Sequence, residues 1–314
     1  MTVAAIFPGQ GSQSVGMGRA LAEASPEARA IWAEADAALG TPISTLAWDG
    51  PAEQLDLTEN AQPAILAASI AIISALGAGW KSAGVKVSAP AFYAGHSMGQ
   101  YSALVAAGAL DLADALRLVR RRGRLMQAAT SGAMAAIIGL DDARLPELEA
   151  AGRAAGTFTI ANRNSPGQVV VSGEVAAVQA AADAAKGIGA RRAIVLPVSV
   201  AAHSPLMADA AAAMRAELAG VTFRDPRAPL LANADARPLT TADACREELV
   251  EHLTRGVDWV RAVEQMVAGG VDTFLEVGPG KVLTGLVKRI APDASAIALD
   301  EPTAPGSIRI PFTD

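Results

Sequence analysis

A serine stands between two glycines in the stretch Gly95-His96-Ser97-Met98-Gly99, which matches the spacing G-x-S-x-G. The apolar run "AFYAG" precedes it and "MGQYSALVAAGAL" follows it, so the pattern predicts a strand, a tight turn and a helix, the arrangement of a nucleophile elbow. A serine at a helix N-terminus lies beside free N–H groups that stabilise a developing oxyanion. We therefore predict that Ser97 is a nucleophile, with a purely structural Gly-Ser-Gly turn as the alternative.

A serine nucleophile needs a base, and the chain contains only three histidines. His252 lies in the charged stretch "REELVEHLTRG" and is expected on a solvated helix face. His96 is adjacent to Ser97, and at such a turn its side chain points away from the hydroxyl. His203, in "LPVSVAAHSPLM", comes after a predicted strand and before a helix, where α/β domains place catalytic loops. Elimination favours His203 as the base, and a helix-capping or core histidine is the alternative.

The acid that orients the histidine in a hydrolase normally lies between the serine and the histidine in the chain. Asp111, Asp141 and Asp183 lie in that interval, but all three stand at helix starts or on helix faces, where they suit capping. A Ser–His dyad with a neutral partner is therefore favoured over a triad. The N–H of Met98 provides one oxyanion donor, and the loop "FPGQGSQ", with Gln10 between two glycines, is the expected source of a second.

The elements that would position these residues alternate between strands and helices. Helices are expected over about 17–39, 61–80, 205–219 and 243–255, and this alternation is typical of an α/β domain with a mainly parallel sheet. The uncharged segment 61–80 is long enough to span a membrane, but its Ala, Ser and Gly content favours a buried core helix. Pro63 fits the first turn of that helix.

A separate pattern runs from about 132 to 199, where the order of predicted elements is β-α-β-β-α-β. This order is that of a ferredoxin-like unit. We therefore expect a large α/β-hydrolase-like domain formed by residues 1–131 and 200–314, with a ferredoxin-like subdomain, 132–199, inserted into it. The proline-rich end of the chain, 300–314, is expected to be a surface tail.

Composition narrows the class of protein. The chain has 314 residues, a formal net charge of -6, 51% hydrophobic and 18% charged residues, which is typical of a globular protein. The acidity disfavours nucleic-acid binding. Cys245 is the only cysteine, sits at the start of a predicted surface helix, and fits a reducing cytoplasm. The N-terminus lacks the basic segment of a secretory signal, so we expect a cytoplasmic protein. No membrane partner and no metal site are expected.

Six blocks in order identify a resemblance: "IFPGQGSQ", "AGHSMGQYSALVAAGAL", "RRRGRLMQ", "IANRNSPGQVVVSG", "VSVAAHSPLM" and "EVGPGKVLTGLVKRI". Together they resemble the malonyl-CoA:acyl carrier protein transacylases and the related acyltransferase domains of polyketide synthases, over about residues 3–300. The resemblance implies a ping-pong reaction. Ser97 would take malonyl from coenzyme A, and the phosphopantetheine thiol of acyl carrier protein would remove it, with His203 as base and then acid. Coenzyme A enters as a substrate thioester, and no separate cofactor is implied.

Matching residue by residue, the resemblance implies that the N–H groups of Gln10 and Met98 form the oxyanion hole and that Arg122 binds the carboxylate of the acyl group. Chemistry supports the last assignment, since a guanidinium grips a carboxylate bidentately. Its neighbours Arg120 and Arg124 are expected on a solvated basic face.

The same resemblance implies substrate-pocket roles for Gln62 and Asn162, and a backbone carbonyl at Asp258 that orients the histidine. Ala202, before the histidine, lines the pocket, and a small residue there accompanies branched extender groups in polyketide domains. Gln100 stands where the family often has Glu.

The partners implied are malonyl-CoA and an acidic acyl carrier protein, with no nucleic acid and a monomeric enzyme expected. Docking an acidic carrier on an acidic chain requires a local basic patch. The candidates are Arg191, Arg192, Lys281, Lys288 and Arg289. A 2-alkylmalonyl transferase, a serine esterase or thioesterase, and a non-catalytic carrier-binding scaffold are the alternatives.

Overall fold

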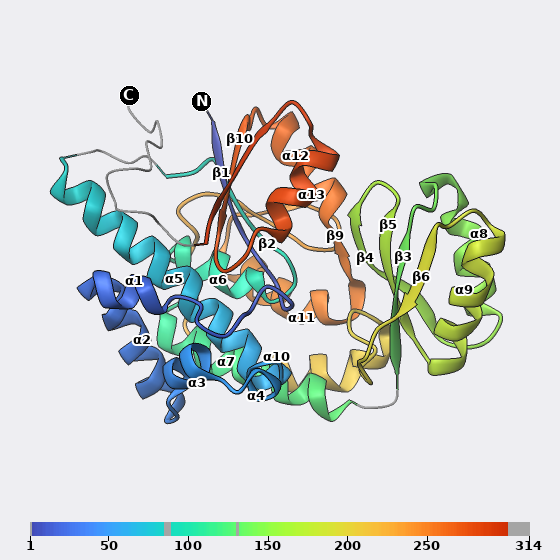
Figure 1. Ribbon diagram of the computed structural model, residues 1–314, viewed down its shortest axis with the longest axis horizontal. Helices are drawn as coiled ribbons and strands as arrows, with labels where there is room; N and C mark the ends of the chain where they lie inside the picture. The colour runs from blue at the N-terminus through green and yellow to red at the C-terminus, as the bar shows by residue number, and fades with distance from the viewer. Residues whose placement is uncertain (1, 85–88, 130–131, 301–314) are drawn as a thin grey trace.

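Two β-sheets organise the computed structural model, which describes residues 2–84, 89–129 and 132–300. The larger sheet and its helices occupy the left and centre of Figure 1, and the smaller sheet with two helices lies beside them at the right. The larger sheet has the strand order β11-β10-β1-β2-β7-β8. Its strands are β1 (Val3–Phe7), β2 (Phe92–Gly95), β7 (Leu230–Leu231), β8 (Pro238–Leu239), β10 (Thr273–Val277) and β11 (Ser295–Leu299).

This sheet is parallel except at β8, which pairs antiparallel with β7. Both of its faces are covered, as expected for parallel strands. In β1, Val3, Ala5 and Phe7 belong to one buried cluster, whereas Ala4 and Ile6 belong to a second one on the opposite face. The alternation follows from the two-residue period of a strand. The α/β architecture predicted from the sequence is therefore confirmed, with mixed sheets.

Helices pack on both faces of the larger sheet (Figure 1). One face carries α12 (Trp259–Ala268) and α13 (Val282–Ile290). The other face packs against the long apolar helix α5 (Thr58–Ser82), and further helices surround it. These are α1 (Arg19–Ala24), α2 (Pro26–Leu39), α3 (Ile43–Asp49), α4 (Ala52–Leu55), α6 (Gly99–Ala106), α7 (Leu112–Ala128), α10 (Ala208–Ala219), α11 (Ala242–Arg255) and the 3₁₀ turn η2 (Pro205–Met207).

The smaller sheet has the strand order β6-β3-β5-β4-β9. In chain order this unit consists of β3 (Ala133–Ile138), η1 (Asp142–Arg144), α8 (Leu145–Arg153), β4 (Phe158–Ser165), β5 (Gln168–Gly173), α9 (Val175–Gly187) and β6 (Arg192–Val195). The first four strands pair antiparallel. The short strand β9 (Val257–Asp258) comes from outside this segment and pairs parallel with β4. The chain of the larger unit thus contributes an edge strand to the smaller sheet.

Several predicted elements differ from the structure. The expected helix 17–39 is divided at Ser25, whose side chain accepts from the N–H of Ala28 and caps α2. Helix α5 begins at Thr58, so Pro63 lies inside the helix rather than in its first turn. The stretch "VDWVRAVEQMVAGG", 257–270, has a helical pattern throughout, but α12 begins only at Trp259, because Val257 and Asp258 form β9. Two further strands, β8 and β11, were not predicted.

Helix α5 satisfies the length and apolarity of a membrane span, but 67% of its most apolar window is buried inside the protein. This burial is the property of a core helix, as expected. Cys245 lies near the start of α11, as expected, but it is fully buried on the inner face of that helix rather than at the surface. Of the expected tail 300–314, residues 301–314 lie outside the described residues.

Candidate functional site

Ser97 occupies a sharp turn between β2 and α6. Its φ of 53° lies in the left-handed region, which a residue with a Cβ seldom adopts. The turn requires both flanking glycines: a methyl group on Gly95 would overlap the backbone of Gly99, and one on Gly99 would overlap the carbonyl of Phe7 in β1. This geometry lifts the serine out of the strand end, so that its side chain stands beside the start of a helix.

The Oγ of Ser97 lies 2.8 Å from the Nε2 of His203. The other ring nitrogen of His203, Nδ1, lies 2.6 Å from the backbone carbonyl oxygen of His252. A carbonyl can only accept, so Nδ1 carries the proton, and Nε2 is left as the acceptor that faces the serine hydroxyl. This tautomer is the one that a general base requires.

The expected histidine-orienting role of Asp258 is wrong. The Asp258 carboxylate accepts from the N–H of Arg261 at 3.0 Å, which caps α12, and pairs with Arg163 at 3.2 Å. The carbonyl that holds His203 belongs instead to the last turn of α11, where carbonyls have no partner inside the helix. His252 itself is fully buried rather than solvated, and its ring centroid lies 6.1 Å from that of His203.

Burial makes His203 a neutral group. Only 4% of the residue is exposed, and desolvation, with a smaller contribution from the charge of Arg122, lowers its pKa to about 3. The hydrogen bond to the His252 carbonyl acts in the opposite direction but is the weaker influence. The imidazole is therefore ready to accept a proton at neutral pH.

Arg122, on α7, is directed at the same serine. Its Nη2 donates to the Ser97 Oγ at 3.0 Å and its Nη1 donates to the Oε1 of Gln62 at 2.9 Å. The side chain is almost fully buried, and burial lowers its pKa to about 10, so the guanidinium stays charged at neutral pH. A buried cation beside the nucleophile is suited to an anionic substrate.

Two backbone N–H groups were expected to form the oxyanion hole, those of Met98 and Gln10. Within residues 2–84, 89–129 and 132–300, neither N–H has a hydrogen-bond acceptor. Met98 is the N-cap of α6, so its N–H adds to the partial positive charge of the helix start. Gln10 lies on the exposed loop after β1, and its side chain contacts Thr58 and Gln62.

The remaining predicted pocket residues occupy different positions. Gln62 is fully buried and contacts Arg122, so its clearest role is to hold the guanidinium. Ala202 is buried next to the base.

Asn162 is buried on β4 beside β9. Asn164, two residues further along the same strand, is the residue whose Oδ1 lies 2.9 Å from the Nε2 of His96. The His96 ring thus bonds to Asn164, whereas the Ser97 hydroxyl bonds to His203 and Arg122.

Three further expectations concern the charged residues Arg124, Arg120 and Asp111, and only the first agrees with the structure. Arg124 is exposed and pairs with Glu59, in agreement with a solvated face. Arg120 is not solvated: it is buried and donates to Thr41 and Asn60. Asp111 stands at the N-cap of α7 but pairs with Arg224 instead of capping the helix with its side chain.

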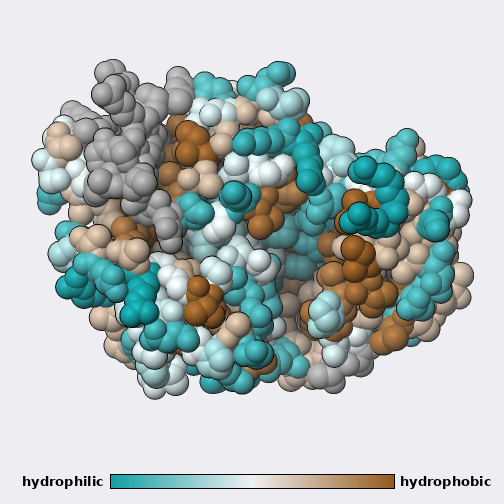
Figure 2. Space-filling view, viewed as in Figure 1, coloured by the Kyte–Doolittle hydropathy of each residue, from teal (hydrophilic) through white to brown (hydrophobic). Residues whose placement is uncertain are grey.

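A cavity of about 220 Å³ is lined by His96, the residue before Ser97, and by Gln10. Its walls come from both units: the loop after β1 and the start of α13 on one side, and Asn164 and Gln168 on the other. Figure 2 shows the surface hollowed between the two units.

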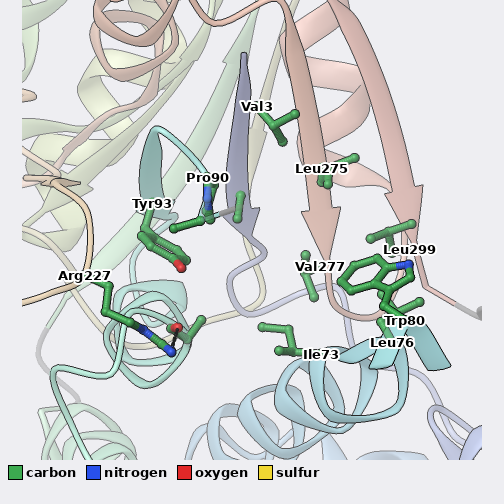
Figure 3. A pocket seen from close by; sticks show the side chains of 13 residues that line it. Val3, Ile73, Leu76, Trp80, Pro90, Tyr93, Arg227, Leu275, Val277 and Leu299 are labelled. Carbon is green, nitrogen blue, oxygen red and sulfur yellow. Dashed lines mark hydrogen bonds between the residues drawn. The ribbon is translucent and has the colours of Figure 1, made fainter. Parts of the chain in front are cut away.

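A second cavity, of about 350 Å³, lies between α5 and the larger sheet (Figure 3). Its lining is apolar except for Tyr93 and Arg227, and it shares no residue with the site around Ser97. No group of three His, Cys, Asp or Glu side chains that could hold a metal occurs in the described part of the chain.

Sequence reasoning missed two contributors to this site. The His252 carbonyl leaves no signal in the sequence, because every residue has one. Asn233, two residues after the buried strand β7, accepts from the N–H of Ser97 at 2.8 Å. A polar residue at the carboxyl end of a strand neighbouring the nucleophile strand is a signal that could have identified it.

Comparison with known proteins gives consistent results. Residues 5–300 match the family model described as "Acyl transferase domain". The chain is similar to the malonyl CoA-acyl carrier protein transacylase of Escherichia coli K12, with 49% identity over 95% of this chain and 96% of that protein.

Two solved structures share the fold over almost the entire chain. An acyl carrier protein S-malonyltransferase from Vibrio cholerae has a TM-score of 0.92 and 42% identity over 98% of this chain and 100% of that one. A malonyl-transacylase solved in complex with a type II polyketide acyl carrier protein has a TM-score of 0.90 and 43% identity, with 98% of each chain covered.

Proposed function

Because the chain belongs to the acyl transferase domain family, we propose that it transfers a malonyl group from malonyl-CoA to the phosphopantetheine thiol of acyl carrier protein. The observation that carries this proposal is the convergence of Arg122 and His203 on one hydroxyl, that of Ser97. The dyad supplies a nucleophile, and the buried guanidinium supplies a partner for the free carboxylate that distinguishes malonyl from acetyl.

The first half-reaction begins when the Oγ of Ser97 attacks the thioester carbon and its proton passes to the Nε2 of His203. The N–H groups of Gln10 and Met98 are proposed to stabilise the oxyanion. Coenzyme A leaves as the thiol with the proton from His203. In the second half-reaction His203 removes the proton of the carrier thiol, and the sulfur attacks the ester carbon. The bond from that carbon to the Ser97 Oγ then breaks, and His203 returns the proton to the Oγ.

We assign Arg122 to the malonyl carboxylate, with Gln62 holding the guanidinium and Ala202 and Asn162 closing the pocket. We assign the cavity between the units to the phosphopantetheine arm, because Gln10 is in its wall. Among the basic candidates, Lys281 precedes Val282 in this wall, and Arg289 donates to Gln168, another wall residue. The carrier is proposed to dock across this entrance.

We also propose the finer fold classes and the domain limits. The strand order β6-β3-β5-β4 with α8 and α9 supports a ferredoxin-like subdomain over 132–199. The parallel sheet and the nucleophile turn support an α/β-hydrolase-like domain over 1–131 and 200–314. A cytoplasmic location in fatty acid or polyketide synthesis, with the enzyme as a monomer that needs no metal or further cofactor, completes the proposal.

Intact-protein mass spectrometry after incubation with malonyl-CoA tests the function. The wild type is expected to gain one malonyl group, and Ser97→Ala is expected to gain none. Adding acyl carrier protein should remove the adduct and yield malonylated carrier. A wild-type protein that stays unmodified, or that releases coenzyme A rapidly without carrier, contradicts the transferase. Competition between malonyl-, methylmalonyl- and acetyl-CoA defines the acyl group.

A further inference from the structure

One side chain holds the backbone on both sides of His96, the residue before the nucleophile. The Oδ1 of Asn233 accepts from the Ser97 N–H at 2.8 Å, and its Nδ2 donates to the Gly95 carbonyl at 2.9 Å. These two backbone groups face the same way from a single strand end. Asn233 is 3% exposed, so water does not compete for them.

The side chain of Asn233 continues the hydrogen-bond pattern of the larger sheet beyond the end of β2. Strands β2 and β7 are parallel neighbours, and their register pairs Tyr93 with Leu230. In a parallel ladder, one residue donates its N–H to the neighbouring strand and accepts through its C=O. The primary amide of Asn233 offers one donor and one acceptor in the same plane and therefore replaces a backbone residue where β2 turns away.

Two more buried side chains fix Asn233 and the strand end. Glu248 of α11 accepts from the Asn233 backbone N–H at 2.7 Å. Gln100 of α6 accepts from the Gly95 N–H at 3.0 Å and donates to the Leu231 carbonyl at 2.8 Å and to Glu248 at 3.4 Å. In this chain the side chain at position 100 therefore both donates and accepts, which a carboxylate does not do.

We propose that Asn233, held by Glu248 and Gln100, is a positioning residue that keeps Ser97 in its left-handed conformation with the Oγ at His203. This inference rests on the proposed role of Ser97 as nucleophile. A φ of 53° at a serine persists only where surrounding contacts determine it. Without the hydrogen bonds from Asn233, Ser97 returns to a more common backbone conformation. Its hydroxyl then loses its contacts with His203 and Arg122.

The test uses Asn233→Ala, Asn233→Asp and, as a control, Asp36→Ala. Asp36 accepts from the N–H and hydroxyl of Ser44, so its loss also removes side-chain bonds to a backbone, but on α2. The rate of Ser97 acylation, the KM for malonyl-CoA, labelling by a fluorophosphonate and the melting temperature are measured for each.

Both Asn233 variants are expected to acylate about 100-fold more slowly, with KM unchanged, because small displacements of a nucleophile cost about that factor. Fluorophosphonate labelling should fall in parallel. Asp36→Ala should lower the melting temperature and leave the acylation rate unchanged. Wild-type acylation rates in both Asn233 variants, or an equal loss in the control, overturn the inference.

Asn233→Asp adds a pH readout that a merely structural role would not give. A protonated carboxyl has one donor and one acceptor, like the amide, so acylation by this variant should recover relative to wild type as pH falls from about 8 to about 5. The titratable and charged groups around this position are Glu248 and His252 of α11, His96 of the turn and Arg237, whose guanidinium lies 3.9 Å from Glu248.

A ratio of variant to wild-type rate that does not change with pH contradicts the inference. Failure of the proposed function is distinguishable, because the wild type would then react with the fluorophosphonate but take no malonyl group.

Discussion

The Nη2 of Arg122 lies 3.0 Å from the Oγ of Ser97 and donates a hydrogen bond to it. Arginine has no acceptor, so the hydroxyl proton of Ser97 has to point at His203, 2.8 Å away. One buried cation therefore orients the Ser97 hydroxyl, and it is the group that we propose to bind the carboxylate of the acyl group. The predictions below follow from this relationship and from the elements that maintain it.

Replacing Arg122 should remove the selection for a carboxylated acyl group. In Arg122→Ala the preference for malonyl-CoA over acetyl-CoA should fall by about 10- to 100-fold, the worth of a hydrogen bond to a charged group. The ratio of kcat/KM for the two thioesters measures it. Arg124→Ala, two residues further along α7 on its exposed face, is the matched control and should keep the ratio. A retained preference in Arg122→Ala would remove this residue from carboxylate recognition.

The pH dependence of acylation should lack the usual histidine titration. Burial and the Arg122 charge lower the pKa of His203 to about 3, so the base is already neutral above that pH and gains nothing as pH rises further. We expect kcat/KM for malonyl-CoA to be level between about pH 5 and pH 8. In Arg122→Ala the pKa should rise, since a like charge has been removed. A wild-type limb near pH 6.5 would contradict the assignment.

The turn at Ser97 should not tolerate a side chain at Gly99. A methyl group there overlaps the Phe7 carbonyl, so Gly99→Ala should displace the turn and lower both acylation and thermal stability. Gly77→Ala is the matched control, since nothing lies within 4 Å of a Cβ at this exposed position of α5. It should stabilise the protein by about 1 kcal/mol. Thermal unfolding and acylation of both variants check this, and equal behaviour refutes it.

Glu248→Gln should change how stability depends on pH. Burial raises the pKa of Glu248 to about 7, so the folded protein keeps a proton that the unfolded chain releases above about pH 4.5. The unfolded state then binds fewer protons, and the wild type loses stability as pH rises through this window.

The amide of Glu248→Gln does not titrate. The difference in the free energy of unfolding between this variant and the wild type should therefore shift in favour of the variant by roughly 3 kcal/mol from about pH 4.5 to pH 7.5. Denaturant unfolding at several pH values measures it. Glu276→Gln, whose carboxyl is also buried with a raised pKa, should show a change of the same sign. A difference that is constant with pH would show that Glu248 is ionised in the folded protein throughout.

Local patterns predicted much of this protein. The apolar run before Gly95 and the glycine spacing around Ser97 sufficed for the strand, the turn and the helix, because these elements form from neighbouring residues. The order of strands and helices indicated an α/β fold, and the ordered motifs indicated the family. Elimination among three histidines singled out His203, the residue that the structure places at Ser97.

The remaining relationships were decided only in three dimensions. Ser97 and His203 are 106 positions apart, and Ser97 and Asn233 are 136 apart, so their contacts depend on how the sheet and helices pack. The expected role of the Asp258 carbonyl failed for this reason. The backbone carbonyl that faces His203 belongs to His252 at the end of α11, and its place depends on how that helix packs.

Three arginines of α7 also differ in a way that the sequence does not show. Arg120 and Arg122 are buried, whereas Arg124, with the same charge on the same helix, is exposed. The sequence determined which chemical groups were available and which local turns could present them. The tertiary structure determined which of those groups meet and which lose their water. Local conformation depends on nearby residues, whereas pKa values and hydrogen-bond partners depend on every element packed around the site.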